Sequence, residues 1–179
     1  MKKIVWTFGL IAGAILAALM FITVPFLDQL GDLNYVIGYT SMILAFLMVY
    51  FGIRSYRDNV MAGVIRFGRA FQVGILITLI ASACYVAAWE IIYHTMMPDF
   101  AEKYAAQQVA QARTAGATEA QIQAKTKAMA SFLEAYKNPL LNVGMTFAEV
   151  FPVGVVVVLV SAGALSRRKA GADPAAARG

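Results

Sequence analysis

The sequence contains few of the residues that enzymes use for chemistry. Its single cysteine, Cys84, excludes a disulfide within the chain, and its apolar neighbours favour a small buried side chain. Its single histidine, His94, has no second histidine or cysteine at ligand spacing, which disfavours a metal site. The sequence also lacks the GxxxxGKS/T, HExxH, CxxC and GxSxG motifs. We therefore expect no enzyme activity, no metal and no cofactor.

Charged residues are also scarce. They make up 14% of the chain, whereas a soluble domain carries about 25%, and hydrophobic residues make up 60%. So little polar surface cannot cover a water-soluble globule of 179 residues. The net charge of +5 does not indicate nucleic acid here, because the basic residues flank apolar segments. The composition predicts an integral membrane protein whose partner is the lipid bilayer.

The apolar residues are concentrated in four runs that are long enough to cross a membrane. Each run has about 19 to 26 residues and, as a helix, measures roughly 28 to 39 Å, against a hydrocarbon core of about 30 Å. The first run is longer than the apolar part of a signal peptide, about 7 to 15 residues, so we expect an uncleaved helix. The predicted spans are residues 4–26, 35–53, 71–93 and 140–165.

Basic residues near the ends of the spans predict the orientation. The positive-inside rule places both termini and the connection between the second and third spans in the cytoplasm. That side then carries ten basic and two acidic residues, and the opposite side carries five basic and six acidic ones. We expect a multi-pass protein of the bacterial inner (cytoplasmic) membrane. The predicted cytoplasmic basic loop contains Arg54, Arg57, Arg66 and Arg69.

The long segment between the third and fourth spans predicts a helical hairpin outside the membrane. Its arms are expected at about 99–114 and 119–137, separated at Gly116. Thr118 and Gln121 have the spacing of a capping box at the start of the second arm. An apolar stripe on this arm either packs the arms together, lies on the bilayer or binds a partner. Its members are Ile122, Met129, Leu133 and Tyr136.

Two glutamates in the apolar runs are the candidate polar site. Glu149 lies about ten residues into the fourth span and is followed by Pro152, which removes a backbone hydrogen bond. A carboxylate at that depth must face the bundle interior or water, as in ion-coupled transporters, or be protonated. The alternative is that Pro152 begins the lipid-buried segment, which would leave Glu149 near the outer interface. Glu90, near the outer end of the third span, is the second candidate and could face Glu149 across the bundle.

Small residues recur along one face of the first span. Gly9, Gly13 and Ala17 lie four residues apart, and such faces let helix backbones approach closely. The face therefore predicts close packing, either within the bundle or in a homodimer.

Part of the sequence resembles a known family. The stretches GIRSYRD at 52–58 and FGRAF at 67–71, with Gly63, Ile65 and Gly74, are similar to a bacterial membrane family called domain of unknown function 4199. The resemblance extends from the first span to Arg168. It implies a small four-helix membrane protein of this topology and brings no activity or site residues.

Taken together, these features predict an all-α transmembrane bundle of four helices with an extracytoplasmic hairpin. Residues 1–169 would form the single domain, and residues 170–179 would be a disordered tail. The leading expectation is a structural or partner-interacting membrane protein, with a homo-oligomer or another membrane protein as its partner. The alternative is a small transporter or channel subunit that uses Glu149 and Glu90. A third interpretation, an assembly scaffold, requires the apolar stripe of the hairpin to be exposed.

Overall fold

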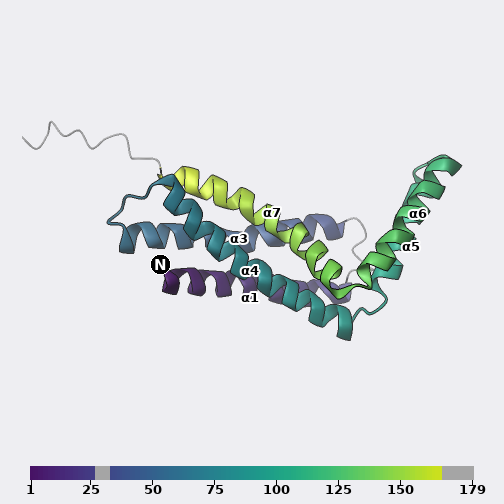
Figure 1. The fold of residues 1–179 in the computed structure, drawn as a ribbon, viewed down its shortest axis with the longest axis horizontal. Coiled ribbons are helices and arrows are strands. Elements are labelled where there is room, and N and C mark those ends of the chain that lie inside the picture. Colours follow the sequence, from purple (N-terminus) through teal and green to yellow (C-terminus); the bar gives the residue numbers. More distant parts are fainter. Residues whose placement is uncertain (27–32, 167–179) are drawn as a thin grey trace, which may run out of the picture.

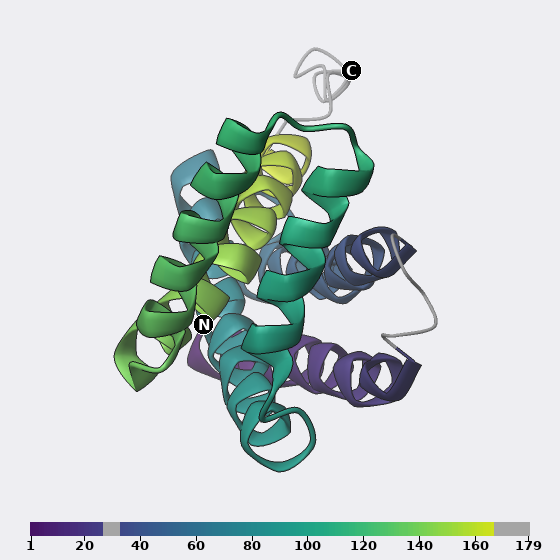
Figure 2. The ribbon, with the colours of Figure 1, turned by 90° about the vertical axis from the view of Figure 1, so that its right-hand side faces the viewer.

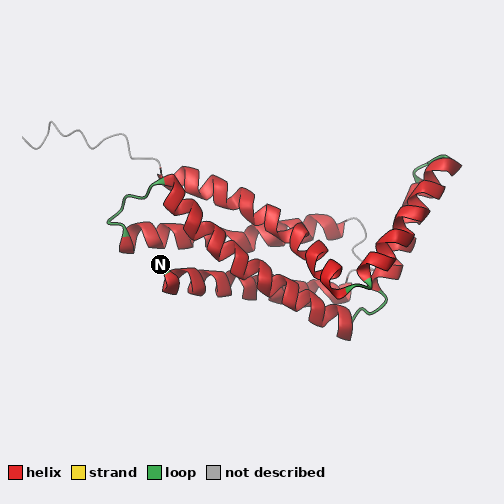
Figure 3. Ribbon diagram, viewed as in Figure 1, coloured by secondary structure: helices red, strands yellow, loops and turns green. Residues whose placement is uncertain are grey.

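The computed structural model describes residues 1–26 and 33–166, and all regular structure in these ranges is helical (Figure 3). The fold is therefore all-α, as the sequence predicts. The acidic connection with Asp28 and Asp32 lies outside the described residues. The predicted tail at 170–179 also lies outside them.

Four helices are long and apolar enough to cross a membrane, and they form an elongated bundle (Figure 1). This confirms the four predicted spans. The N-terminus and the end of the last helix lie at one end of the bundle, and the hairpin lies at the other (Figure 1). The bundle consists of α1 (Lys2–Thr23), continued by the short 3-10 helix η1 (Val24–Phe26), with α3 (Leu33–Val60), α4 (Phe67–Thr95) and α7 (Pro139–Ser166).

The loop between α3 and α4 is shorter than the sequence predicts, because both helices continue beyond their apolar runs. The chain reverses at Ala62 and Gly63, whose φ angles are 49° and 84°. The Gly63 amide donates a hydrogen bond of 2.9 Å to the Arg57 carbonyl, which closes the end of α3. The four arginines of the predicted loop are Arg54 and Arg57 within α3, Arg66 just before α4, and Arg69 in the first turn of α4.

The centre of the bundle is α4, which packs against α1, α3 and α7. Glycines bring the backbones close together at these contacts. A Cβ at Gly154 of α7 would overlap the side chains of Thr78 and Phe46, so only glycine fits there without a rearrangement. Around this contact the core is apolar and tightly closed. Its largest fully buried apolar side chains are Phe46, Val49, Ile53, Val73, Ile77, Ile92, Val150 and Val158.

The small-residue face of α1 lies inside the bundle. A Cβ on Gly9 would lie 2.8 Å from the Cβ of Ile80, and one on Gly13 would lie 2.5 Å from the Cβ of Cys84. Ala17, further along the same face, packs against an apolar cluster that includes residues of α4. The structure thus places this face against α4 and not on a surface that is open to a second copy.

Large apolar side chains cover the outside of the bundle. Trp6 is 57% exposed and Val156 is 60% exposed. A continuous apolar surface of this kind is unfavourable in water and suits lipid hydrocarbon. The protein is therefore a multi-pass membrane protein with four candidate spans. Other exposed apolar residues of the four helices are Leu10, Ile11, Ile22, Ile43, Leu44, Leu47, Leu159 and Val160.

The predicted hairpin is present as α5 (Phe100–Thr114) and α6 (Glu119–Tyr136). Gly116, with φ at 74°, lies in the turn between them. The capping box is complete, because the Gln121 amide donates to Thr118 Oγ1 at 3.4 Å and the Thr118 amide donates to Gln121 Oε1 at 2.8 Å. The local sequence pattern therefore determines where α6 begins.

The apolar stripe of α6 is turned towards the rest of the protein. Tyr136 is buried, and Ile122, Met129 and Leu133 are half-buried. The two arms lie side by side in front of the bundle (Figure 2), and Met129 and Leu133 line a groove together with residues of α5. Of the three alternatives, this arrangement matches packing between the arms. The scaffold interpretation, which requires an exposed stripe, stays a prediction, because Ile122, Met129 and Leu133 are only half-buried.

Candidate functional site

A cavity of about 510 Å³ lies at the hairpin end of the bundle. Side chains from α1, α3, α4, α7 and both hairpin helices line it. Apolar walls with a few polar groups are typical of sites that bind small molecules. The aromatic residues in the lining are Tyr35, Tyr39, Tyr85, Trp89, Phe100, Tyr104, Phe132 and Tyr136.

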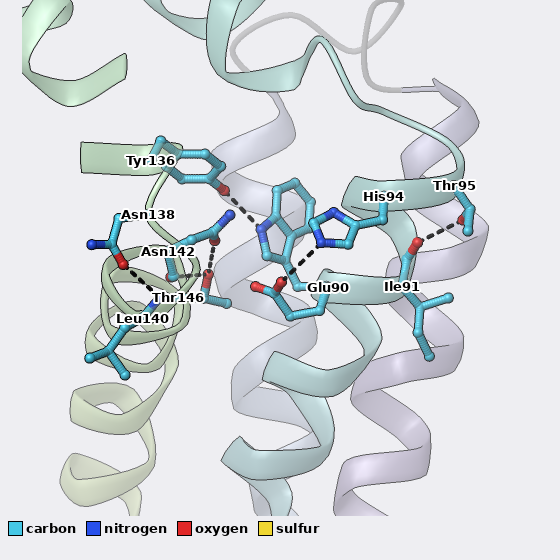
Figure 4. A network of polar contacts seen from close by, with 10 residues as sticks. Glu90, Ile91, His94, Thr95, Tyr136, Asn138, Leu140, Asn142 and Thr146 are labelled. Carbon is cyan, nitrogen blue, oxygen red and sulfur yellow. Dashed lines mark hydrogen bonds and ion pairs between the residues drawn. The ribbon is translucent and has the colours of Figure 1, made fainter. Parts of the chain in front are cut away.

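A buried hydrogen bond fixes the hairpin to the bundle at this cavity. Trp89 Nε1 in α4 donates to Tyr136 Oη in α6 at 2.8 Å (Figure 4). Phe100 of α5 meets the Trp89 ring edge to face, with 4.7 Å between the centroids. Tyr93 makes a similar contact with Tyr136 at 5.3 Å. Edge-to-face contacts with a satisfied Trp N–H hold the base of the hairpin in one position.

Tyr136 accepts this hydrogen bond as a neutral phenol. Its burial raises the pKa of the hydroxyl, and the hydrogen bond from Trp89 opposes that effect only in part. Burial also raises the pKa of Tyr104 on α5, a second aromatic residue of the lining. The hairpin therefore contributes uncharged phenol groups to the cavity at neutral pH.

Glu149 is the one carboxylate among the described residues that line the cavity. It lies ten residues after Pro139, or about 15 Å along α7. Its side chain is exposed, and it makes no hydrogen bond or ion pair within residues 1–26 and 33–166. A carboxyl group without a protein partner in a candidate span is either protonated or solvated by water or a ligand.

Among the described residues, the lining also contains one cation, Lys103, and this cation has an acidic neighbour of its own. Lys103 Nζ lies 2.9 Å from Asp99 Oδ2, one turn earlier at the start of α5. The hydrogen bond from Lys103 lowers the pKa of Asp99, as expected for a pair that is charged at neutral pH. Lys103 is therefore paired with Asp99, and Glu149 is the charge of the lining that has no counter-ion among the described residues.

The second predicted carboxylate, Glu90, does not line the cavity. Its Oε2 lies 4.0 Å from His94 Nε2 in the next turn of α4 (Figure 4). Its Oε1 is buried and has no hydrogen-bond partner in the described part of the chain. The structure thus brings Glu149, but not Glu90, to the cavity, and the expected pair across the bundle is not part of this site.

Polar groups continue from the cavity into the bundle along α4. Thr78 and Ser82 are fully buried, and their hydroxyls have no hydrogen-bond partner among the described residues. Tyr85, on the same face one turn further on, lines the cavity. Across from α4, Thr146 of α7 donates to the Asn142 carbonyl at 3.0 Å and also faces the cavity (Figure 4).

Pro152 lies within α7, which runs unbroken from Pro139 to Ser166, and the alternative that the lipid-buried part of this helix begins at Pro152 stays a prediction. It cannot donate the usual backbone hydrogen bond to the carbonyl of Ala148. This leaves a polar carbonyl next to Glu149 in the chain. The proline therefore increases the polarity of α7 at the level of the cavity.

The aromatic lining was not predicted as a site. Tyr35 and Tyr39 in α3, like Phe100 and Tyr104 in α5, are four residues apart and so share a face. That spacing is the available signal, but aromatic residues are also expected at both membrane interfaces. Only the fold shows that these pairs meet at one cavity.

The fold and the site can be compared with known proteins. A family described as "Protein of unknown function (DUF4199)" matches residues 7–167. The matched region includes most of α1 and all of α3 to α7, with the hairpin and Glu149. The chain matches no curated protein and no solved structure. The chain therefore belongs to the DUF4199 family, whose function is unknown.

Proposed function

We propose that this protein is a membrane-embedded binding component, of the transporter or channel-subunit kind, and that its working site is the cavity at Glu149. The observation that supports this proposal most strongly is the position of the carboxylate. Glu149 lines a cavity of about 510 Å³ and has no protein partner in the described part of the chain. In this proposal the protein binds a small molecule and does not transform it.

The energetic cost of Glu149 favours this proposal over a purely structural role. An acidic residue near the centre of a span costs about 2.5 to 3.5 kcal/mol on insertion scales. A residue that only stabilised the bundle would offset this cost by hydrogen bonds or an ion pair within the protein. Glu149 has neither among the described residues, so either protonation of its carboxyl or a solvating molecule in the cavity offsets the cost, and the cavity provides space for such a molecule.

We further propose that the cavity faces the extracytoplasmic side of the bacterial inner membrane. The hairpin end lies opposite the end with the N-terminus and the four arginines of the α3–α4 region (Figure 1). The positive-inside rule places that basic end in the cytoplasm.

Cysteine accessibility tests the proposal directly. The chain's one native cysteine is replaced by the Cys84→Ala substitution, and Glu149→Cys is then introduced. We expect a membrane-impermeant, charged thiol reagent to label this position in intact cells, because the cavity is open to water on the extracytoplasmic side. Val156→Cys, on the same helix and at a 60% exposed position facing lipid, is the matched control and should remain unlabelled.

The same experiment defines what would contradict the proposal. If Glu149→Cys stays unlabelled in both intact cells and inside-out vesicles, the site is closed to water, and the binding proposal fails. Labelling only in inside-out vesicles would leave the cavity but reverse the orientation. Labelling of Val156→Cys to the same extent would show that the reagent reaches lipid-facing positions, and the comparison would then be repeated with a larger reagent.

A further inference from the structure

The charges in the cavity indicate the sign of the ligand. Glu149 is the uncompensated carboxylate of the lining, and Lys103 is held 2.9 Å from Asp99. An anion entering the cavity would meet the charge of Glu149 and would have to compete with Asp99 for the lysine. A cation would meet Glu149 directly, in surroundings where apolar walls strengthen the attraction.

The walls indicate what kind of cation fits. Aromatic rings from α3, α4, α5 and α6 line the cavity, and the faces of such rings attract organic cations. Tyr85 and Trp89, one turn apart on α4, lie on the same side of the bundle as Tyr39 of α3. The volume of about 510 Å³ falls within the range of roughly 300 to 1,000 Å³ that is typical of small-molecule sites.

Inorganic cations fit the cavity less well. Calcium and magnesium require six or more oxygen ligands, commonly including carboxylates. In the part of the chain that the structure describes, no group of three or more His, Cys, Asp or Glu residues could hold a metal ion. A single carboxylate within an aromatic lining is the arrangement that proteins use for substituted ammonium groups.

From these observations we propose that the cavity binds an amphiphilic organic cation, with an amine or quaternary ammonium group at Glu149 and an apolar body against the aromatic walls. This inference rests on the proposed binding function and names its ligand class. The cation has two potential sources, a free amphiphilic amine or the ammonium headgroup of a membrane lipid. Both present the same chemistry to Glu149.

The two tryptophans of the chain, Trp6 and Trp89, make the inference measurable. Trp6 is 57% exposed at the far end of α1, so Trp6→Phe leaves Trp89, in the cavity lining, as the single reporter. The full-length Trp6→Phe protein is placed in nanodiscs of phosphatidylglycerol and titrated with benzyltrimethylammonium. We expect a saturable change in Trp89 fluorescence, and no such change with benzenesulfonate, an anion of similar size.

Variants locate the binding within the cavity. Glu149→Gln should weaken the binding of benzyltrimethylammonium at least about tenfold, as expected for the loss of one ion pair in apolar surroundings. Lys137→Gln, outside the cavity lining, should change it by less than about twofold, because that charge is exposed and paired with Glu134. Tyr39→Leu should weaken binding severalfold and Tyr39→Phe should restore it, since the second variant keeps the ring. Tyr39 is 49% exposed, so neither change disturbs the core.

Nanodiscs that also contain phosphatidylethanolamine separate the two sources. If this lipid lowers the apparent affinity for benzyltrimethylammonium in the parent protein but not in Glu149→Gln, the ligand is a lipid headgroup. If it has no effect, the ligand is a free cation.

The inference is overturned if benzyltrimethylammonium gives no saturable signal up to about 10 mM, or if Glu149→Gln binds it as well as the parent. Labelling of Glu149→Cys would in that case still support the proposed binding function. A failure of the proposed ligand class can therefore be told apart from a failure of the proposed function.

Discussion

The hydrogen bond between Trp89 and Tyr136 should determine how firmly the hairpin is docked on the bundle. The donor and acceptor are 2.8 Å apart, and the two residues are only 9% and 6% exposed. Tyr136→Phe keeps the ring and its contacts with Tyr93, Phe100 and Phe132 but leaves the Trp89 N–H buried without an acceptor. Leaving a buried donor unsatisfied costs about 1 to 3 kcal/mol.

This cost should appear in the exchange of backbone amides in the hairpin. A loss of about 1 to 3 kcal/mol in the docking free energy corresponds to roughly 5- to 160-fold faster exchange through undocking. Hydrogen exchange of α5 and α6, measured by mass spectrometry in nanodiscs, is the assay. The core of α4 near Ile77 should not change, because the bundle remains folded.

Two comparisons make this prediction specific. Tyr93→Phe removes a hydroxyl from the same cluster, but this hydroxyl makes no hydrogen bond within the described residues, so exchange should stay near that of the parent. The double variant Trp89→Phe/Tyr136→Phe removes both ends of the bond and should cost less than the sum of the two single variants. If Tyr136→Phe exchanges like Tyr93→Phe, or if the two single effects are additive, the bond does not hold the hairpin.

Three other predictions concern the remaining contacts and the effect of pH. Gly13→Ala should destabilise the bundle by about 1 to 3 kcal/mol in SDS titrations, because its Cβ would lie 2.5 Å from that of Cys84, whereas Gly38→Ala meets no atom within 4 Å and should cost nothing. Thr118→Ala should remove the capping box and speed exchange in the first turn of α6 about fivefold, for a cost of about 1 kcal/mol. Because burial raises the pKa of Tyr136, the undocked phenol ionises first as the pH rises above about 10. Docking should therefore weaken in the alkaline range, as followed by Trp89 fluorescence in Trp6→Phe, but not when Tyr136→Phe is also present.

The sequence predicted the four spans because membrane burial imposes a simple requirement, about 20 consecutive apolar residues. It placed their ends less well. α3 continues to Val60 and α4 begins at Phe67, although polar residues there interrupt the hydropathy signal. Backbone hydrogen bonding extends a helix into the interface, where polar side chains are solvated and hydropathy no longer marks the helix. The hairpin was easier to predict, because Thr118 caps α6 by a local contact.

Predicting the candidate site from the sequence was harder, because its walls come from elements far apart in the chain. Glu149 is conspicuous as a carboxylate within an apolar run, and it does line the cavity. Glu90 gives the same signal, but Trp89 lines the cavity in its place. Adjacent residues of a helix point about 100° apart, so the packing of α4 determines which of the two faces the cavity. Hydropathy contains no information about how α4 is rotated about its own axis.

The hairpin anchor and the proposed ligand share the same residues, and this has a thermodynamic consequence. Trp89 and Tyr136 line the cavity and also form the bond that docks α6. A ligand that binds only the docked state must stabilise docking, by about 2.7 kcal/mol at a concentration 100 times its dissociation constant. Saturating benzyltrimethylammonium should therefore slow exchange in α5 and α6 by up to roughly 100-fold, and this protection should be lost in Glu149→Gln.

Because ligand binding and hairpin docking are coupled, a change in docking should also affect the affinity for the cation. If the hairpin is docked in nearly all molecules, Tyr136→Phe speeds amide exchange but hardly changes the affinity for the cation. The fraction of molecules whose docked hairpin allows binding then stays near one. If docking is marginal, the same substitution weakens the apparent affinity in proportion to the docked fraction that is lost. Cation binding that leaves exchange in α5 and α6 unchanged would show that the cation binds without the hairpin. The cavity lining contributed by Phe100, Tyr104 and Tyr136 would then have no part in recognition.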